Sequence, residues 1–160
     1  MTTMGVRLVK MRFGVVLAGE GGALPKMTRP IRSFLGCTLG SGRQGISWIH
    51  IEDLVRLLLE SARNPGFEGA VNATAPRPIS QKAFTLALAR LLHRPVWPLP
   101  SGLTRFASRW LLGELAESML LEGAYVYPKK ARTLGFSFKF EKADAALADL
   151  LGRTVSGRQG

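Results

Sequence analysis

The sequence predicts an α/β protein in which a few parallel strands are followed by a mostly helical C-terminal part. Short apolar stretches of strand length alternate with amphipathic stretches of helical length, an order that favours a parallel sheet. The chain of 160 residues is 46% apolar, with 18 glycines and 9 prolines, which is typical of an ordinary globular domain. We therefore expect a folded α/β domain with a buried core.

The first predicted strand runs from Val6 to Leu17, where alternating apolar and basic residues give way to a nearly continuous apolar run. Gly14 within it marks a point where another backbone can come close. A glycine-rich turn, Gly19 to Gly22, then leads into a predicted helix from Ala23 to Leu35. Such a turn can hold a phosphate, but this one lacks the Gly-x-Gly-x-x-Gly and Gly-Lys-Ser/Thr patterns, so a plain turn is the better interpretation.

A second strand, Ile46 to Ile49, is followed by a predicted helix from Ile51 to Arg63 and by a third strand from Ala70 to Ala75. Glu52 and Asp53 occupy the first helical turn, where the helix dipole favours acidic groups. The helical positions that we expect to be buried are Ile51, Leu54, Val55, Leu58 and Ala62.

Ser80 is a suitable N-cap for the next helix, which His93 and Arg94 close. The later part of the chain predicts an extended piece over residues 96–99, helical pieces between Leu103 and Leu121, an edge strand from Phe136 to Phe140 and a last helix from Glu141 to Leu151. The predicted organisation is thus a sheet-containing part over residues 1–92, a helical part over 93–151 and a disordered tail over 152–160.

Charge and cysteine content narrow the functional classes. The net charge of +11 favours anionic partners, but the basic residues are scattered and lack the stacking aromatics of a single-strand binder, so we do not expect nucleic-acid binding. The one cysteine, Cys37, cannot form an internal disulfide and is interpreted as a small apolar residue. No run has the length of a membrane span or of a signal peptide, which predicts a cytoplasmic protein with no membrane partner.

The stretch from Gly40 to Val55 concentrates the polar groups that carry chemistry. It combines a two-glycine turn, Arg43 and Gln44, and then Trp48 and His50 before the acidic start of a helix. Polar groups on a loop between regular elements often form binding sites. The alternative is a plain connection from a strand to a helix, in which Arg43 is solvated, Trp48 belongs to the core and His50 is a helix-start residue.

Only two strands are convincingly buried, which is few for a sheet of this class because its edges would be left unpaired. We therefore expect the chain to be part of a larger sheet.

Several separate motifs, in the same order, resemble the epimerase-like branch of the extended (atypical) short-chain dehydrogenase/reductases. The N-terminal matching stretches are Arg12 to Leu17, Gly21 to Met27, Gly40 to Gln44, Ser47 to Leu54 and Asn72 to Pro76. The stretches His93 to Pro95, Leu120 to Gly123, Pro128 to Lys130 and Leu134 to Phe136 resemble the C-terminal domain of unknown function attached to that branch. The resemblance covers residues 5–151.

The resemblance implies the C-terminal part of an NAD(P)-binding Rossmann-like fold with a mostly helical, substrate-side subdomain. In complete members the first half carries the glycine-rich dinucleotide fingerprint and a Tyr-x-x-x-Lys pair on one helix, and hydride transfer at nicotinamide is the implied chemistry. Neither motif is matched here. Tyr125 and Lys129 have the right spacing, but Pro128 belongs in the first turn of a helix and would leave Tyr125 outside it.

The resemblance assigns site residues only by position. Arg12, Phe13, Gly14 and Val15 match the segment beside the nicotinamide and are the expected cofactor-binding residues. Members that act on nucleotide sugars usually have asparagine where Val15 stands and tyrosine where Leu17 stands, so that substrate class is not favoured. The expected substrate-binding residues are Arg43, Gln44, Trp48 and His50.

We therefore expect the substrate-side half of an NAD(P)-dependent epimerase or oxidoreductase, with an unknown, anionic small-molecule substrate. Alone, this half is expected to be inactive and not to bind NAD(P). The alternative is a non-catalytic binding protein that reuses this half as a scaffold. In either case an exposed sheet edge predicts self-association or pairing with a missing N-terminal half.

Overall fold

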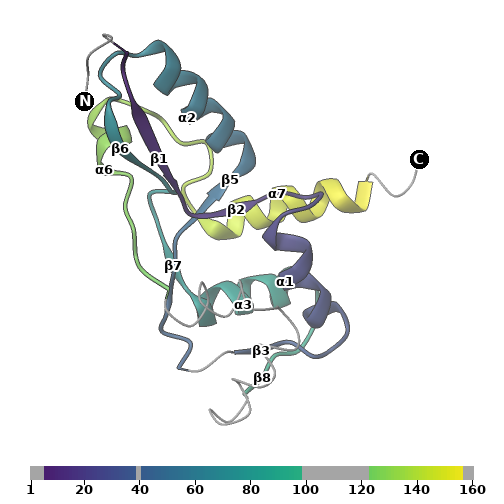
Figure 1. The fold of residues 1–160 in the computed structure, drawn as a ribbon. Coiled ribbons are helices and arrows are strands. Elements are labelled where there is room, and N and C mark those ends of the chain that lie inside the picture. Colours follow the sequence, from purple (N-terminus) through teal and green to yellow (C-terminus); the bar gives the residue numbers. More distant parts are fainter. Residues whose placement is uncertain (1–5, 39–40, 99–122, 157–160) are drawn as a thin grey trace.

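The computed structural model describes residues 6–38, 41–98 and 123–156. Its strands form two-stranded pairs, of which three are parallel and one is antiparallel (Figure 1). The parallel pairs are β1 (Val9–Phe13) with β6 (Gly69–Ala73), β2 (Val15–Leu17) with β5 (Trp48–His50), and β3 (Cys37–Thr38) with β8 (Trp97–Pro98). The antiparallel pair is β4 (Gly45–Ile46) with β7 (Ile79–Ser80).

The predicted first strand is divided at Gly14. The Gly14 amide donates to the Ala73 carbonyl at 3.1 Å, whereas the next amide, that of Val15, donates to Ser47 at 2.7 Å. The chain therefore changes its pairing partner from β6 to the β5 segment within one residue. The second predicted strand is divided in the same way, into β4 and β5.

The three helices of the first part are α1 (Ala23–Arg32), α2 (Ile51–Arg63) and α3 (Gln81–Leu91). α1 is shorter than predicted, because Phe34 adopts a left-handed φ of 61° and ends the helical conformation. α2 has the predicted bounds, and Ser80 caps α3 as predicted by accepting from the Ala83 amide at 3.3 Å.

The buried face of α2 differs from the predicted one. Leu54 is buried as predicted, but Ile51, Val55 and Leu58 are 37%, 48% and 39% exposed, and Ala62 is exposed as well. The helix instead buries Asp53, Leu54, Leu57 and Ser61. The prediction failed because α2 is apolar on two sides, and a buried carboxylate, Asp53, selects which side faces inward.

Two hydrophobic cores lie on opposite faces of the β2–β5 pair. Successive residues of a strand point to opposite faces. Accordingly Val15 and Trp48 belong to the first core, whereas Val16 and Ile49 belong to the second. The first core contains α1, α3 and the C-terminal helix α7 (Ala143–Ser156), and the second contains α2, β6 and the short helix α6 (Lys129–Thr133).

Both cores join residues from either side of position 92. Phe84 and Leu88 share the first core with Leu147, and Phe67 shares the second with Phe138. The helices predicted between Leu103 and Leu121 lie outside the described residues. α7 continues to Ser156, so helix covers part of the segment expected to be a disordered tail.

The segment from Phe136 to Phe140 is not the predicted edge strand. The backbone amides of Lys139 and Phe140 donate to the two carboxylate oxygens of Asp53, at 2.9 and 2.8 Å. A carboxylate thus takes the hydrogen bonds that a neighbouring strand would otherwise take. Within the described part of the chain, no helix combines the length and the apolar character that crossing a membrane requires.

Candidate functional site

A pocket of about 200 Å³ lies where β1 ends and β2 begins. The carboxyl ends of parallel strands are the usual position for ligands in open α/β sheets. Its lining comes from three segments that are distant in sequence: Phe13, Gly14 and Val15; Gly45, Ile46 and Ser47; and Gly123, Ala124 and Val126. The pocket therefore joins the predicted cofactor segment to residues 45–47, in the middle of the predicted substrate-side stretch Gly40 to Val55.

Two glycines allow the walls of this pocket to approach one another. A Cβ atom on Gly14 would lie 2.5 Å from the Ser47 carbonyl oxygen, and one on Gly45 would lie 2.7 Å from Tyr125 Cδ2. Both neighbours are too close for any side chain. The sequence suggested a close approach at Gly14, and the structure identifies Ser47 as the backbone that approaches it.

Polar side chains hold the segment 123–127 over the pocket. The Ser47 hydroxyl donates to the Ala124 carbonyl at 2.6 Å and accepts from the Val126 amide at 2.8 Å. Thr74 Oγ1 donates to the Val126 carbonyl, and Asn72 Nδ2 donates to the Tyr127 carbonyl, each at 3.2 Å. We call residues 123–127 the strap. Its position is fixed by hydrogen bonds from the ends of β5 and β6.

Three of the four predicted cofactor residues line the pocket. Phe13, which is 55% exposed, is one of the lining residues, together with Gly14 and Val15. Arg12 is exposed but is not part of the lining.

The predicted substrate residues separate into two groups. Arg43 is exposed, and its backbone carbonyl accepts from the Tyr125 hydroxyl at 2.9 Å, which ties the substrate loop to the strap. Gln44 is half-buried, and its carbonyl accepts from the Gln81 amide at 2.8 Å. Trp48 and His50 are both fully buried and line no part of this pocket. Trp48 lies in the first core and donates from Nε1 to the Arg77 carbonyl at 3.1 Å.

His50 acts as the N-cap of α2. Its Nδ1 accepts from the Glu52 amide at 3.1 Å, so the proton of the neutral ring lies on Nε2, 3.3 Å from Asp149 Oδ2. The ring stacks on Phe140 with centroids 3.9 Å apart. Burial lowers the pKa of His50, against the opposing effect of the Asp149, Asp53 and Glu52 charges. His50 therefore connects α2 to α7 as a neutral side chain.

Asp53 and Tyr125 have roles that the sequence did not reveal. Asp53 is fully buried and accepts from Arg56 Nη1 at 2.8 Å in addition to the two backbone amides. Its place in a first helical turn is also that of any dipole-favoured acid, so sequence offers no signal for the contact with residues 139–140. Tyr125 lies in the strap, ahead of α6, so Tyr125 and Lys129 do not share a helix.

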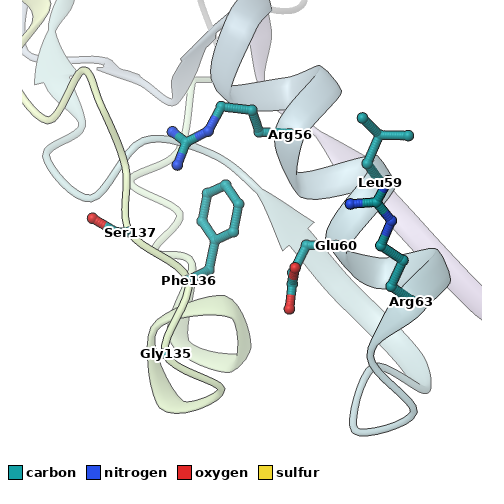
Figure 2. Close-up of a pocket in the computed structure, with 7 residues that line it drawn as sticks. All are labelled: Arg56, Leu59, Glu60, Arg63, Gly135, Phe136 and Ser137. Atoms are coloured by element: carbon teal, nitrogen blue, oxygen red, sulfur yellow. The ribbon is translucent and has the colours of Figure 1, made fainter.

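A second pocket, of about 350 Å³, lies between α2 and the segment after α6 (Figure 2). It is lined by Arg56, Leu59, Glu60, Arg63, Gly135, Phe136 and Ser137. Arg56 is already engaged, because it pairs with Asp53 and lies 5.4 Å from the centre of the Phe136 ring. The remaining charges, Glu60 and Arg63, have opposite signs, so this pocket favours neither anions nor cations. Among the described residues, no cluster of His, Cys, Asp or Glu could hold a metal ion.

Comparison with known proteins shows which proteins this chain resembles. The chain is 43% identical to the epimerase family protein YfhF of Bacillus subtilis over 149 residues, which is 92% of this chain and 47% of the relative. It is also 43% identical to the chloroplastic SDR39U1 homologue of Arabidopsis thaliana, over 91% of this chain and 41% of that protein. The human epimerase family protein SDR39U1, solved with NADPH, superposes on 91% of this chain with a TM-score of 0.79 and 34% identity.

The chain corresponds to the C-terminal half of an epimerase-like short-chain dehydrogenase/reductase. It spans about half the length of the curated relatives that it matches, and 48% of the human structure. Residues 103–150 match a domain of unknown function, DUF1731. Within the described residues, α6, the Asp53-bound segment and most of α7 lie in this domain. The domain of unknown function thus contributes helix α7 to the first core and Phe138 to the second.

Proposed function

We propose that this chain is the substrate-side half of an NAD(P)-dependent epimerase or oxidoreductase, and that the pocket at Gly14 receives the reacting ends of cofactor and substrate. The observation that carries the proposal is the pocket itself, which joins the predicted nicotinamide segment, Phe13 to Val15, to the loop that carries Arg43. The NADPH in the related human structure supports the choice of cofactor class.

The pocket fits one end of a dinucleotide only. Pockets for whole drug-sized ligands measure roughly 300–1,000 Å³, and this one measures about 200 Å³. None of the described residues that line it has a basic side chain, whereas a pyrophosphate needs cationic or helix N-terminal groups. A bound nicotinamide would supply hydride chemistry here, with Phe13 and the Gly14 backbone forming one wall. The phosphates would be held by a part of the enzyme outside this half.

Arg43 is the proposed contact for an anionic substrate. Its side chain is exposed two residues before Gly45, a pocket-lining glycine, and its backbone is fixed by the Tyr125 hydroxyl. An arginine on a fixed backbone can bind a carboxylate or phosphate in bidentate fashion. Trp48 and His50 are not included in the proposed site, because both are fully buried.

A fusion of this chain to the N-terminal half of YfhF tests the proposal. We expect this chain alone to bind no NADPH and to show no turnover, and the fusion to bind NADPH in a fluorescence titration. Phe13→Ala in the fusion should weaken NADPH binding by roughly ten- to a hundredfold, because a buried aromatic face contributes on the order of 1.5–3 kcal/mol. Phe34→Ala, at an equally exposed phenylalanine outside the pocket, is the control.

Two results would contradict the proposal. One is turnover of NAD(P)H by this chain alone. The other is a folded fusion that binds no NADPH, which would favour the non-catalytic scaffold instead.

A further inference from the structure

Two helices end in the same unusual way beside the β3–β8 pair. α1 leads into β3 and α3 leads into β8, so the two helix ends lie in the same part of the molecule (Figure 1). Shortly after each helix one residue has a left-handed φ, of 61° at Phe34 and of 52° at His93. Among the described residues, these are the two positions other than glycine at which φ is positive.

Both helix ends have the hydrogen bonds of a Schellman motif. After α3 the Arg94 amide donates to the Ala89 carbonyl at 2.9 Å, and after α1 the Leu35 amide donates to the Pro30 carbonyl at 2.8 Å. Glycine is the usual residue at the left-handed position of this motif, because any side chain there is strained. Strained backbone of this kind occurs preferentially at functional sites, so the side chains at the two positions indicate a function for this surface.

A pocket of about 420 Å³ lies at the end of α3, and His93 is one of its lining residues. The others are Leu86, Ala89, Arg90, Arg94 and Val96. The volume falls within the range of sites for small organic ligands, roughly 300–1,000 Å³. This pocket shares no lining residue with the pocket at Gly14, so it is a separate site.

The lining combines apolar side chains with two arginines and a histidine, and none of the described lining residues is acidic. Arg94 is exposed and pairs with no acidic side chain in the described part of the chain. Its guanidinium lies 4.3 Å from the centre of the Phe34 ring, which holds it beside the pocket. Trp97 Nε1 donates to the Phe34 carbonyl at 3.3 Å and fixes this turn. Arg90 lies 3.5 Å from Asp144, but both side chains are exposed and such pairs are weak.

We propose that this pocket binds a small organic anion, in which a carboxylate or a phosphate is joined to an apolar group. Arg90 and Arg94 hold the charged head, because guanidinium groups bind both kinds of anion through paired N–H donors. The imidazole of His93 supplies a further donor. Leu86 and Val96 line the part of the pocket that receives the apolar group.

This assignment gives the two strained positions different roles. His93 contacts the ligand, whereas Phe34 is a positioning residue that acts through Arg94. The inference is independent of the proposed function, since its test needs neither NADPH nor turnover. The headgroup of an anionic lipid has the same chemistry as a free anion of this class, and the experiment separates the two.

Titration calorimetry of the full 160-residue chain with hexyl phosphate and with octanoate tests the proposal. We expect one molecule of either compound to bind per chain. Inorganic phosphate supplies only the head and hexanol only the apolar group. Each should bind roughly tenfold or more weakly than hexyl phosphate, because apolar burial and charge-assisted hydrogen bonds both contribute.

Variants at the two basic positions connect this binding to the pocket. Arg94→Ala should weaken it by about tenfold, the effect of losing one hydrogen bond to a charged group. Arg132→Ala is the matched control, at an exposed arginine of α6 outside the pocket, and should leave the affinity unchanged. Circular dichroism verifies that each variant is folded.

His93→Gly separates a binding role from a structural one. Glycine adopts the left-handed conformation without strain, so the thermal unfolding temperature should rise while binding weakens. His93→Asn tolerates the same conformation and keeps a side-chain donor, so it should bind more tightly than His93→Gly.

Three results would overturn the proposal. The first is hexyl phosphate that binds no more tightly than inorganic phosphate, and the second is equal binding by the Arg94→Ala and Arg132→Ala variants. The third is binding to vesicles that contain phosphatidylglycerol without binding of either soluble anion, which would identify the surface as a membrane contact instead.

Discussion

At the scale of single residues, Asp53 is the clearest case of one side chain organising two distant segments. It is fully buried and accepts hydrogen bonds from Arg56 and from the amides of Lys139 and Phe140. Its removal would leave two backbone amides without their acceptor, and each unsatisfied buried group costs about 1–3 kcal/mol. We expect Asp53→Ala to lower the free energy of unfolding by about 3 kcal/mol in urea denaturation.

The control for Asp53 is another aspartate in an ion pair. Asp144 is 65% exposed and lies 3.5 Å from Arg90 Nη2. Exposed pairs contribute about 0–1 kcal/mol, so Asp144→Ala should change stability little. Equal effects of the two substitutions would contradict the role assigned to Asp53.

His50 predicts a pH dependence of stability. Burial lowers its pKa in the folded protein below the ordinary value of 6.5, so the unfolded chain binds the proton more readily. Stability contributed by neutral His50 is complete above about pH 6.5 and declines as the pH falls below that value. Asp149, Asp53 and Glu52 oppose the shift and limit its size.

His50→Asn separates this effect from the general loss of carboxylate charge. Asparagine retains an N-cap acceptor for the Glu52 amide but does not titrate. We expect the free energy of unfolding of the variant to vary less between pH 7 and pH 5 than that of the wild type. Parallel curves for the two proteins would show that His50 does not titrate in this range.

The sequence left the roles of Trp48 and His50 open, and the reason is physical. An aromatic and a histidine at the end of a strand satisfy the requirements of a pocket wall and of a core equally well. Burial decides between the two, and burial depends on Phe140 and Asp149, which lie about 90 residues further along the chain.

At the scale of elements, the strap packs so closely on Gly45 that its position should depend on the absence of a side chain there. A Cβ on Gly45 would lie 2.7 Å from Tyr125 Cδ2 and 2.8 Å from the Tyr125 amide nitrogen. Overpacking against backbone costs about 1–3 kcal/mol. Gly45→Ala should therefore lower the thermal unfolding temperature and displace the strap, which chemical-shift changes at Ser47 and Val126 would report.

Gly152 is the matched control, because the residue lies inside α7 and a Cβ there meets no atom of the described residues within 4 Å outside its own stretch of helix. Alanine in an open helical position stabilises by roughly 0.5–1 kcal/mol. A Gly45→Ala variant that is as stable as the Gly152→Ala variant would refute the tight approach of the strap.

The sequence was sufficient to predict that α2 is a helix and where it ends, but not which of its sides is buried. The bounds of α2 follow from its capping residues, His50 and Asn64. The buried side of α2 could not be predicted, because apolar residues line two sides of the helix. The side that carries the buried Asp53 is the one that faces inward. The alternation from Phe136 to Phe140 indicated a strand, but side-chain alternation cannot reveal that a carboxylate takes the place of a partner strand.

At the scale of the whole molecule, the two cores argue against an independent C-terminal unit. Leu147 of α7 is fully buried in the same core as Phe84 and Leu88 of α3. The sequence predicted a boundary near residue 92, because composition changes there from mixed to mostly helical. Composition along the chain does not reveal that the last helix returns to the first sheet, so the boundary in sequence is not a boundary in packing.

A substitution in α7 distinguishes one cooperative unit from two. Leu147→Ala removes a fully buried leucine, which should cost about 2–5 kcal/mol. If the cores form one unit, urea denaturation should show a single transition, shifted as a whole and identical by tryptophan fluorescence, to which Trp48 of the first core contributes, and by far-ultraviolet circular dichroism. Leu86→Ala, 39% exposed on α3, should shift it by less than about 1 kcal/mol. A second transition that alone responds to Leu147→Ala would mean that α7 folds separately from the sheet, and the pocket, whose strap precedes α7, would then not depend on the C-terminal helix.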